Sequence, residues 1–196
     1  DEEEYILCCE EYWGIKVNRL TYDLNDENML KEIYCKWNES PIDLGSVIPQ
    51  YHLFDAVAKT GHRIVLSGDG ADELFGGYRR IKEYDSQGSD MYDELTYYHL
   101  PRLDRMSMAH TIELRNPFLG HDVVRMALGL KLSDRYNKQI LKDAFEGKIP
   151  LSIISRPKAP LKNDSIKQNA LEYRRKVIDL YKANAEAYLP LKEYRV

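Results

Sequence analysis

The sequence predicts an α/β fold in which a partial parallel sheet is followed by a mostly helical half. Helix and strand patterns alternate from Tyr5 to Ser67, and this order favours a parallel sheet with helices packed on its faces. A polar, turn-rich stretch, EYDSQGSDMYDE, comes next, and from there to the end only helical patterns occur. We therefore expect a partial α/β half at 1–85, a helical half at 86–162 and a helical tail at 163–196.

Two elements are expected at the start of the chain. Apolar residues recur at helical spacing from Tyr5 to Trp13, and Gly14 is well placed to end this helix because glycine readily adopts the left-handed conformation. In the following stretch, IKVNRLTYDL at 15–24, apolar and polar residues alternate. This alternation predicts a strand.

A capped helix is expected next. Asn25 or Asp26 can cap a helix that runs to Trp37, because both side chains accept hydrogen bonds from free backbone N–H groups. The elements expected after it are a loop at 38–49, a helix at 50–60 ended by Gly61, a short buried strand RIVLS at 63–67, and helices at 95–108, 120–130, 137–146 and 165–185.

The composition is that of an ordinary globular domain, with 43% of the 196 residues hydrophobic and 31% charged. A net charge of −4 argues against a general affinity for nucleic acid or for an anionic membrane surface. No apolar run approaches the roughly 20 residues that a membrane-spanning helix needs. The three cysteines, Cys8, Cys9 and Cys35, lack metal-ligand spacing, so we expect reduced thiols in a cytoplasmic protein.

An acidic, glycine-rich loop follows the strand expected at 63–67. The stretch VLSGDGADELFGGYRR, at 65–80, combines four glycines with the carboxylates of Asp69, Asp72 and Glu73. In open α/β sheets, ligands bind just beyond the carboxyl ends of the strands, where the loops diverge. Crowded carboxylates repel one another, so a divalent cation is the first candidate to offset that repulsion.

The loop offers groups for both an anion and a cation. Ser67 and Gly68 can present a hydroxyl and backbone N–H groups to a phosphate. Asp72 can give oxygen ligands to Mg²⁺, which usually takes one or two carboxylates together with substrate phosphates. A solvated turn or a calcium loop is the alternative, although the stretch fits an EF-hand poorly because Leu74 and Phe75 follow at once.

Two further segments carry charged residues in an unusual setting. RLDRMSMAHTIELRNPFLGHD, at 102–122, mixes Asp104, Arg105, Glu113 and Arg115 with apolar residues, which predicts buried or half-buried ion pairs among these four. Its histidines, His110 and His121, lack ligand partners at helical spacing. In SRPKAPLKND, at 155–164, two prolines hold Lys158 on a stiff, non-helical segment, which suits either a phosphate contact or a solvated loop.

These segments together resemble the asparagine synthetase family. LSGDGADELFGGYRR, LDRMSMAHTIELRNPFLGHD and SRPKAPLKND, preceded by ESPIDLGSVIPQY, occur in the order and approximate spacing of that family's motifs over 1–162. The resemblance implies an ATP-pyrophosphatase (adenine nucleotide alpha hydrolase-like) domain. Such a domain activates a carboxylate, by default that of aspartate, with Mg-ATP as an acyl-adenylate. Ammonia that a separate glutaminase domain releases from glutamine then displaces AMP to form an amide.

The resemblance also implies roles for individual residues. Nucleotide or substrate contacts fall to Ser67, Gly68 and Gly70, magnesium binding to Asp72 and Glu73, and support of the site to Asp104, Arg105 and Glu113. Asp69 would face the reacting carboxyl group and orient the amine or take its proton. Lys158 would stabilise negative charge on the departing phosphates.

Two parts of the family pattern do not occur in this sequence. One is a Ser-Gly-Gly-x-Asp-Ser nucleotide loop, which cradles pyrophosphate and supplies a second magnesium carboxylate; the other is the glutaminase domain with its nucleophilic cysteine. We therefore expect this chain alone to bind Mg-ATP poorly, and a second chain or an upstream segment to complete it. The alternatives are a relative that acts on another acid, such as a lactam or peptide cyclase, an inactive synthetase-like interaction protein, and a metal-binding module without turnover.

Overall fold

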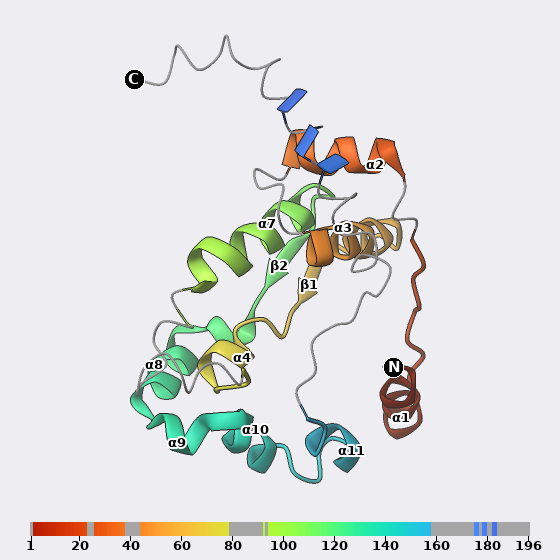
Figure 1. Cartoon of the computed structure of the whole chain (residues 1–196). Helices are drawn as coiled ribbons and strands as arrows, with labels where there is room; N and C mark the ends of the chain where they lie inside the picture. Colours follow the sequence, from red (N-terminus) through yellow and green to blue (C-terminus); the bar gives the residue numbers. More distant parts are fainter. Residues whose placement is uncertain are drawn as a thin grey trace, which may run out of the picture. The chain divides into compact units, whose positions relative to one another are not determined.

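The computed structural model describes residues 2–22, 26–37, 44–78, 92, 94–157 and six positions in the tail between 175 and 183. This part of the chain is mostly helical and contains one parallel sheet of two strands (Figure 1). The contacts divide the chain into two compact units. The first unit comprises Asp1–Arg19, Leu66–Leu100 and Arg115–Pro160, and the second comprises Leu20–Val65, Pro101–Leu114 and Leu161–Val196. The boundaries at 85 and 162 expected from the sequence remain predictions.

The first helix of the first unit is α1, Glu3–Trp13, and it confirms the helix expected from the sequence. Gly14 follows it with a φ of 62°, and the Gly14 N–H donates to the Glu10 carbonyl. This left-handed conformation costs glycine little because it has no Cβ, which explains why the helix ends here.

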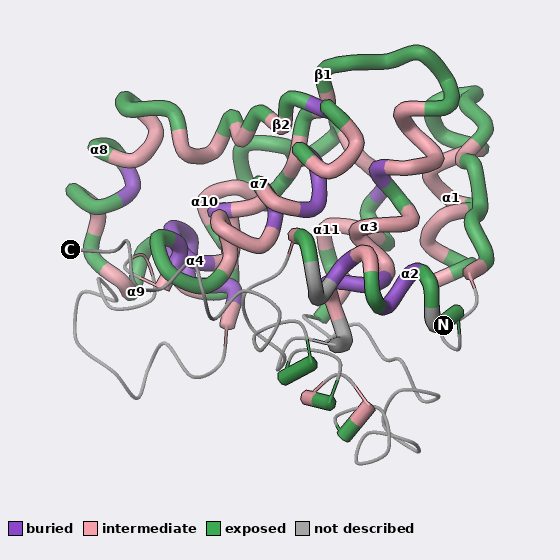
Figure 2. Tube along the Cα trace, turned by 90° about the horizontal axis from the view of Figure 1, so that it is seen from above, coloured by how far each residue is buried: buried purple, intermediate pink, exposed green. Residues whose placement is uncertain are grey.

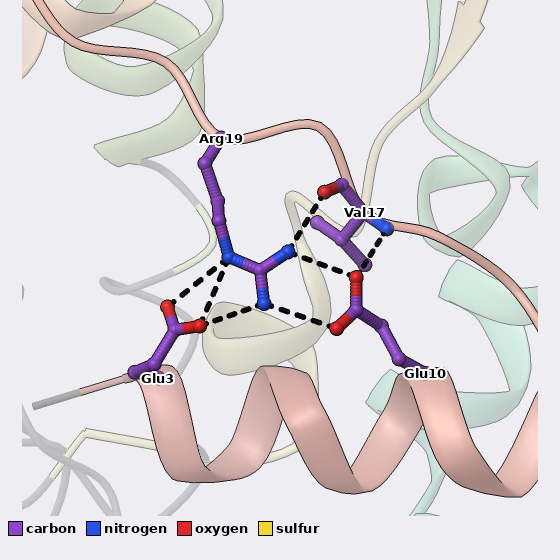
Figure 3. Close-up of polar contacts among 4 residues, drawn as sticks. All are labelled: Glu3, Glu10, Val17 and Arg19. Carbon is purple, nitrogen blue, oxygen red and sulfur yellow. Dashed lines mark hydrogen bonds and ion pairs between the residues drawn. The ribbon is translucent and has the colours of Figure 1, made fainter.

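The prediction of a strand after α1 is wrong, since residues 15–22 form no secondary structure. Figure 3 shows the reason: the Arg19 guanidinium bonds the carboxylates of Glu3 and Glu10 on α1, and ties the segment back along the helix. The N–H of Val17 donates to Glu10 Oε1 at 2.7 Å. Part of the backbone hydrogen bonding of this segment is thus satisfied by a side chain instead of a neighbouring strand.

The capped helix is confirmed, and Asp26 is its cap. The Asp26 carboxylate accepts from the N–H groups of Asn28 and Met29, at the start of α2, Glu27–Lys31. A π-helical stretch, η1, Glu32–Trp37, continues it.

The next helix, α3, covers Leu44–Lys59 and begins before the expected start at residue 50. Pro49 lies inside it, although the sequence predicts a loop at 38–49 that includes this proline. Val47 and Ile48, the two residues directly before Pro49, are fully buried. Burial of these two apolar side chains offsets the hydrogen bond that the proline removes.

The sheet consists of β1, Ile64–Leu66, and β2, Glu113–Arg115. The strand expected at 63–67 is confirmed, but Ile64 and Leu66 are 50% and 70% exposed, so it is not a buried strand in the described part of the chain. β2 contradicts the expectation that only helices follow Leu95. It is three residues long, too short to show a strand period in the sequence.

The remaining helices largely agree with the sequence. The helix expected at 95–108 is present as η2, Leu95–His99, and α7, Leu100–Met108; that at 120–130 as α8, His121–Gly129; and that at 137–146 as α10, Gln139–Ala144. Short elements that were not expected are η3, Pro117–Leu119, α9, Leu132–Arg135, η4, Tyr136–Lys138, and α11, Leu151–Ile154. Most of the helix expected at 165–185 lies outside the described residues.

Each unit buries its own cluster of apolar residues, and the buried positions are coloured purple along the chain in Figure 2. The larger cluster consists of Met29, Leu30, Ile33, Val47, Ile48, Phe54, Met106 and Ile112, all in the second unit. The smaller one, Leu74, Phe75 and Ala127, lies in the first unit, where α4, Ala71–Leu74, packs against α8. The smaller cluster supports α4, which carries part of the acidic loop.

Candidate functional site

The acidic loop leaves β1 at Ser67, whose N–H donates to the Arg115 carbonyl at 2.9 Å and extends the pairing of the sheet by one bond. The Ser67 hydroxyl then donates to the Asp69 carboxylate, and the Asp69 N–H donates to Ser67 Oγ at 3.2 Å. These two bonds close a turn on itself at the carboxyl end of the strand. Ser67 and Asp69, predicted from the sequence to act at one site, therefore lie together.

The two glycines beside Asp69 differ in their surroundings. A Cβ at Gly68 would meet no atom within 4 Å, so the backbone there lies open. Gly70 has a φ of 92°, and a Cβ at this position would overlap the side chain of Leu119. Gly70 is thus required by the turn itself, whereas Gly68 is the position at which a ligand could approach the backbone.

Asp72, the expected magnesium ligand, lies on α4 and meets a lysine that the sequence analysis did not single out. Lys138 Nζ is 2.8 Å from Asp72 Oδ1, and the two side chains are 32% and 20% exposed. A Cβ at Gly77 would overlap Asp72 Oδ1, so this glycine makes room for the carboxylate. The Asp72 carboxylate is accordingly held in one place by a partner and by a space that only glycine leaves.

Glu73, the next residue of α4, is enclosed. Its side chain is 4% exposed, the Tyr78 hydroxyl donates to its Oε1 at 3.0 Å, and His99 Nε2 lies 3.5 Å from the same oxygen. Adjacent residues of a helix point in different directions, which explains why Glu73 is buried while Asp72 remains partly exposed. These contacts anchor α4 to its surroundings.

The residues expected to support the site belong to the second unit. Asp104 is exposed on α7, and its backbone carbonyl accepts from the Ser107 hydroxyl at 3.1 Å. Arg105 is half-buried, and its carbonyl accepts from the Ala109 N–H. Glu113 is exposed on β2, and its N–H donates to the Arg63 carbonyl at 2.8 Å. Their role at the site remains a prediction.

Lys158, expected to act on the same phosphates as Asp72, lies outside the described residues. The segment just before it is anchored in the first unit. Arg156 donates to the Glu2 carboxylate through both terminal nitrogens, and its guanidinium lies 4.3 Å from the centre of the Tyr5 ring. The end of α11 is thereby attached to the start of α1.

A metal ion in the described part of the chain would have few protein ligands. No group of three or more His, Cys, Asp or Glu side chains lies close enough together there to hold one. Mg²⁺ does not need such a group, since it keeps waters and takes phosphate oxygens beside one or two carboxylates. Asp72 alone therefore fits a magnesium ion that arrives with a phosphate ligand, and fits a structural zinc or calcium site poorly.

Other sequence-based expectations can also be compared with the structure. Cys8 and Cys9 are free thiols, as expected. Within the ranges that the structure describes, no helix is long and apolar enough to cross a membrane. His121 is exposed at the start of α8, and His110 is half-buried, with Nδ1 3.9 Å from Asp55 Oδ1.

The fold and loop define an α/β protein with a candidate ligand site at the carboxyl end of a parallel strand. The sequence matches the asparagine synthase family over residues 15–95 and 85–193. The chain belongs to this family.

Named relatives agree with the family match. The chain is 34% identical over 157 residues to a Methanocaldococcus jannaschii protein named as a glutamine-hydrolysing asparagine synthetase, covering 75% of this chain and 28% of that protein. It is 28% identical over 123 residues to asparagine synthetase B of Escherichia coli (56% and 22%), and 33% identical over 113 residues to the asparagine synthetase of Gallus gallus (51% and 20%). The alignments thus span between 20% and 28% of the length of these relatives.

Proposed function

We propose that this chain is the synthetase portion of an asparagine synthetase-like enzyme of the ATP-pyrophosphatase fold. In this proposal it activates a carboxylate, by default that of aspartate, with Mg-ATP as an acyl-adenylate, and an amide then forms with ammonia, free or released from glutamine. The acidic loop carries the proposal: the motif SGDGADE lies at the carboxyl end of a parallel strand, with an open backbone at Gly68 and a fixed carboxylate at Asp72. Membership of the asparagine synthase family supports the same chemistry.

The chemistry explains why such a loop would be needed. A carboxylate is a poor electrophile, and a mixed anhydride with AMP turns one of its oxygens into a good leaving group. The protein has to position the reactants and neutralise charge on the phosphates, and needs little covalent participation of its own. Magnesium, when bound, supplies much of that neutralisation.

The loop residues divide this work in the proposal. Gly68 lets the nucleotide or the activated acid approach the backbone, and Asp72 binds the magnesium ion. Asp69, oriented by the Ser67 hydroxyl, accepts the proton of the incoming amine or orients it. Glu73, enclosed by its own contacts, acts on magnesium binding chiefly by fixing α4.

Two ammonium groups would neutralise the departing pyrophosphate. Lys138 lies beside Asp72, so it is at hand for phosphate oxygens next to the same metal. Lys158 is proposed for the same task from the sequence pattern alone. The Ser-Gly-Gly-x-Asp-Ser loop does not occur in this sequence, and we propose that a segment carrying that loop, together with a glutaminase, completes the site.

The test is aspartate-dependent exchange of labelled pyrophosphate into ATP. It is measured with this chain plus a segment that carries the Ser-Gly-Gly-x-Asp-Ser loop, supplied in trans or fused. We expect exchange to occur, and to fall at least about 100-fold in Asp72→Ala and Lys158→Ala, because each substitution removes charge stabilisation from the phosphates. Lys131→Ala, which removes an exposed lysine just before α9, is the control and should retain full exchange. Full activity in Asp72→Ala would contradict the proposed magnesium role of Asp72. Exchange with another acid but not with aspartate would show that aspartate is not the substrate.

A further inference from the structure

The helix that carries Asp72 is too short to hold its own position. α4 covers only Ala71–Leu74, and isolated helices below about 12 residues are marginal in water. The placement of the Asp72 carboxylate must therefore come from contacts made by the rest of the unit. Several of these contacts come from a single segment, Arg135–Lys138, which comprises the last residue of α9 and all of η4.

This segment bonds three successive carbonyls at the end of α4. Arg135 donates through Nη1 to the Leu74 carbonyl, the Lys138 N–H donates to the Phe75 carbonyl at 2.8 Å, and the Asn137 N–H donates to the Gly76 carbonyl at 2.8 Å. Carbonyls at the end of a helix lack partners within it, so these bonds satisfy groups that would otherwise need water. The Lys138 ammonium adds the ion pair to Asp72.

The backbone of this segment adopts conformations that are energetically unfavourable for non-glycine residues. Asn137 and Lys138 both have left-handed backbones, with φ values of 57° and 59°, which non-glycine residues rarely adopt. Arg135 is 1% exposed, and a Cβ at Gly76 would lie 2.9 Å from the Tyr136 Cα. Strained residues of this kind persist where the surroundings over-determine them, and they cluster at functional sites.

We propose that Arg135–Lys138 is a carbonyl clamp whose function is to position the Asp72 carboxylate for its ligand. Arg135 and Asn137 are positioning residues in this assignment, because they act on the ligand only through the backbone of α4. The inference rests on the proposed role of Asp72 in binding a metal–pyrophosphate complex, and extends it to residues outside every motif of the sequence.

Asn137 offers a matched pair of variants. Asn137→Gly keeps the N–H and accepts the left-handed backbone, so the clamp should remain closed. Asn137→Pro removes the N–H and requires a φ near −65°, so the clamp should open. Tyr136 already has the extended backbone (φ −54°, ψ 143°) that a following proline requires, and Asn137 is exposed, so the buried core is left intact.

The first readout is hydrogen exchange at the amides of Ala71–Phe75, in the 196-residue chain without ligand. We expect exchange to be at least about tenfold faster in Asn137→Pro than in the wild type, and unchanged in Asn137→Gly. Equal protection in all three proteins would overturn the clamp, whatever the loop binds.

The second readout is the binding of Mn²⁺ and inorganic pyrophosphate to this chain plus the segment that carries the Ser-Gly-Gly-x-Asp-Ser loop, monitored by the electron paramagnetic resonance of free Mn²⁺. We expect Asn137→Pro to bind the complex about tenfold more weakly than the wild type, because a displaced ligand group loses much of its contribution. Asn137→Gly should bind within twofold of the wild type. If Asp72→Asn weakens binding while Asn137→Pro does not, the clamp proposal is wrong. If Asp72→Asn has no effect, the proposed metal role of Asp72 is wrong, and the exchange readout still decides whether the clamp holds α4.

Discussion

The guanidinium of Arg19 bonds two carboxylates on α1 and the carbonyl of Val17, and all of these groups are near the surface (Figure 3). The Arg19 hydrogen bonds, followed by the bond from the Val17 N–H, lower the pKa of Glu10 from its ordinary value of 4.5 to about 2. The Glu10 carboxylate therefore stays ionised in the folded protein at pH values where it would be protonated in the unfolded chain. These contacts hold residues 15–22 against α1, so the segment forms no strand although its apolar and polar residues alternate.

This arrangement predicts how acid acts on the amino-terminal segment. Because the folded pKa of Glu10 lies below the unfolded value, the contribution of the ionised carboxylate to stability is complete above about pH 4.5 and is lost as the pH falls toward 2. Glu10→Gln should therefore have a lower melting temperature than the wild type at pH 7, and the difference should shrink between pH 4.5 and 2. Differential scanning calorimetry across this range measures it. Glu11→Gln, an exposed neighbour, is the control, and an equal effect from it would contradict the assignment.

Local chemistry decides which single residues can be predicted from the sequence. The Asp26 cap could be predicted because its partners, Asn28 and Met29, lie within three positions of it. Lys138 could not, because its partner Asp72 is far away along the chain and no motif surrounds the lysine. The only signal near it is Asn137, a residue type that tolerates the left-handed backbone and so marks a turn.

At the scale of elements, the length of a pattern decides what the sequence can predict. α1 was expected because apolar residues recur at helical spacing along its whole length, and α8 and α10 were expected because helical patterns occur at 120–130 and 137–146. β2 was not expected, since three residues cannot display a period, and its pairing depends on β1 far earlier in the chain. The start of α3 was placed too late because Pro49 read as a loop residue, while the burial of the side chains before it is a tertiary effect.

The acidic loop gives a prediction at this scale that separates binding from stability. Gly77→Ala places a Cβ against the Asp72 carboxylate, so we expect it to cost about 1–3 kcal/mol of stability and to weaken binding of Mn²⁺ with pyrophosphate. Gly68→Ala meets no atom within 4 Å and should cost no more than about 0.5 kcal/mol.

The informative measurement is the ligand binding of Gly68→Ala. If the nucleotide approaches the backbone at this position, Gly68→Ala should weaken binding of Mg-ATP by the completed enzyme while urea unfolding stays unchanged. Unchanged binding in this variant would show that Gly68 is not a contact position, without affecting the assignment of Asp72.

At the scale of the whole molecule, the two units take their residues from alternating parts of the chain, and the division falls inside both strands. Sequence patterns describe elements one at a time, so they do not reveal which distant segments share a unit. The family motifs are different, because a motif such as SGDGADE can be recognised in the sequence without knowledge of how the loop packs. The chemistry of the acidic loop could be predicted for this reason, whereas the clamp that holds it could not.

Acid stability of the whole chain provides the last prediction, through two histidines of the second unit. The His52 ring stacks on Tyr22 with centroids 5.1 Å apart, and the His110 ring meets Tyr51 edge-on at 4.4 Å. Burial lowers the pKa of both imidazoles below their ordinary value of 6.5, although the nearby Asp55 carboxylate partly opposes the effect. Both are therefore neutral in the folded protein at pH 7.

The sign of the resulting pH dependence follows from proton uptake. Below pH 6.5 the unfolded chain binds protons at both histidines that the folded chain still excludes, so stability falls as the pH drops through 6.5 toward the folded pKa values. The urea midpoint of the wild type should decrease between pH 7 and 5, and it should decrease less in the double variant His52→Gln, His110→Gln. His121→Gln, which removes an exposed imidazole, should behave as the wild type. An equal decrease in the wild type and the double variant would mean that the two histidines have the same pKa values in the folded and the unfolded protein, and that Asp55 fully offsets their burial.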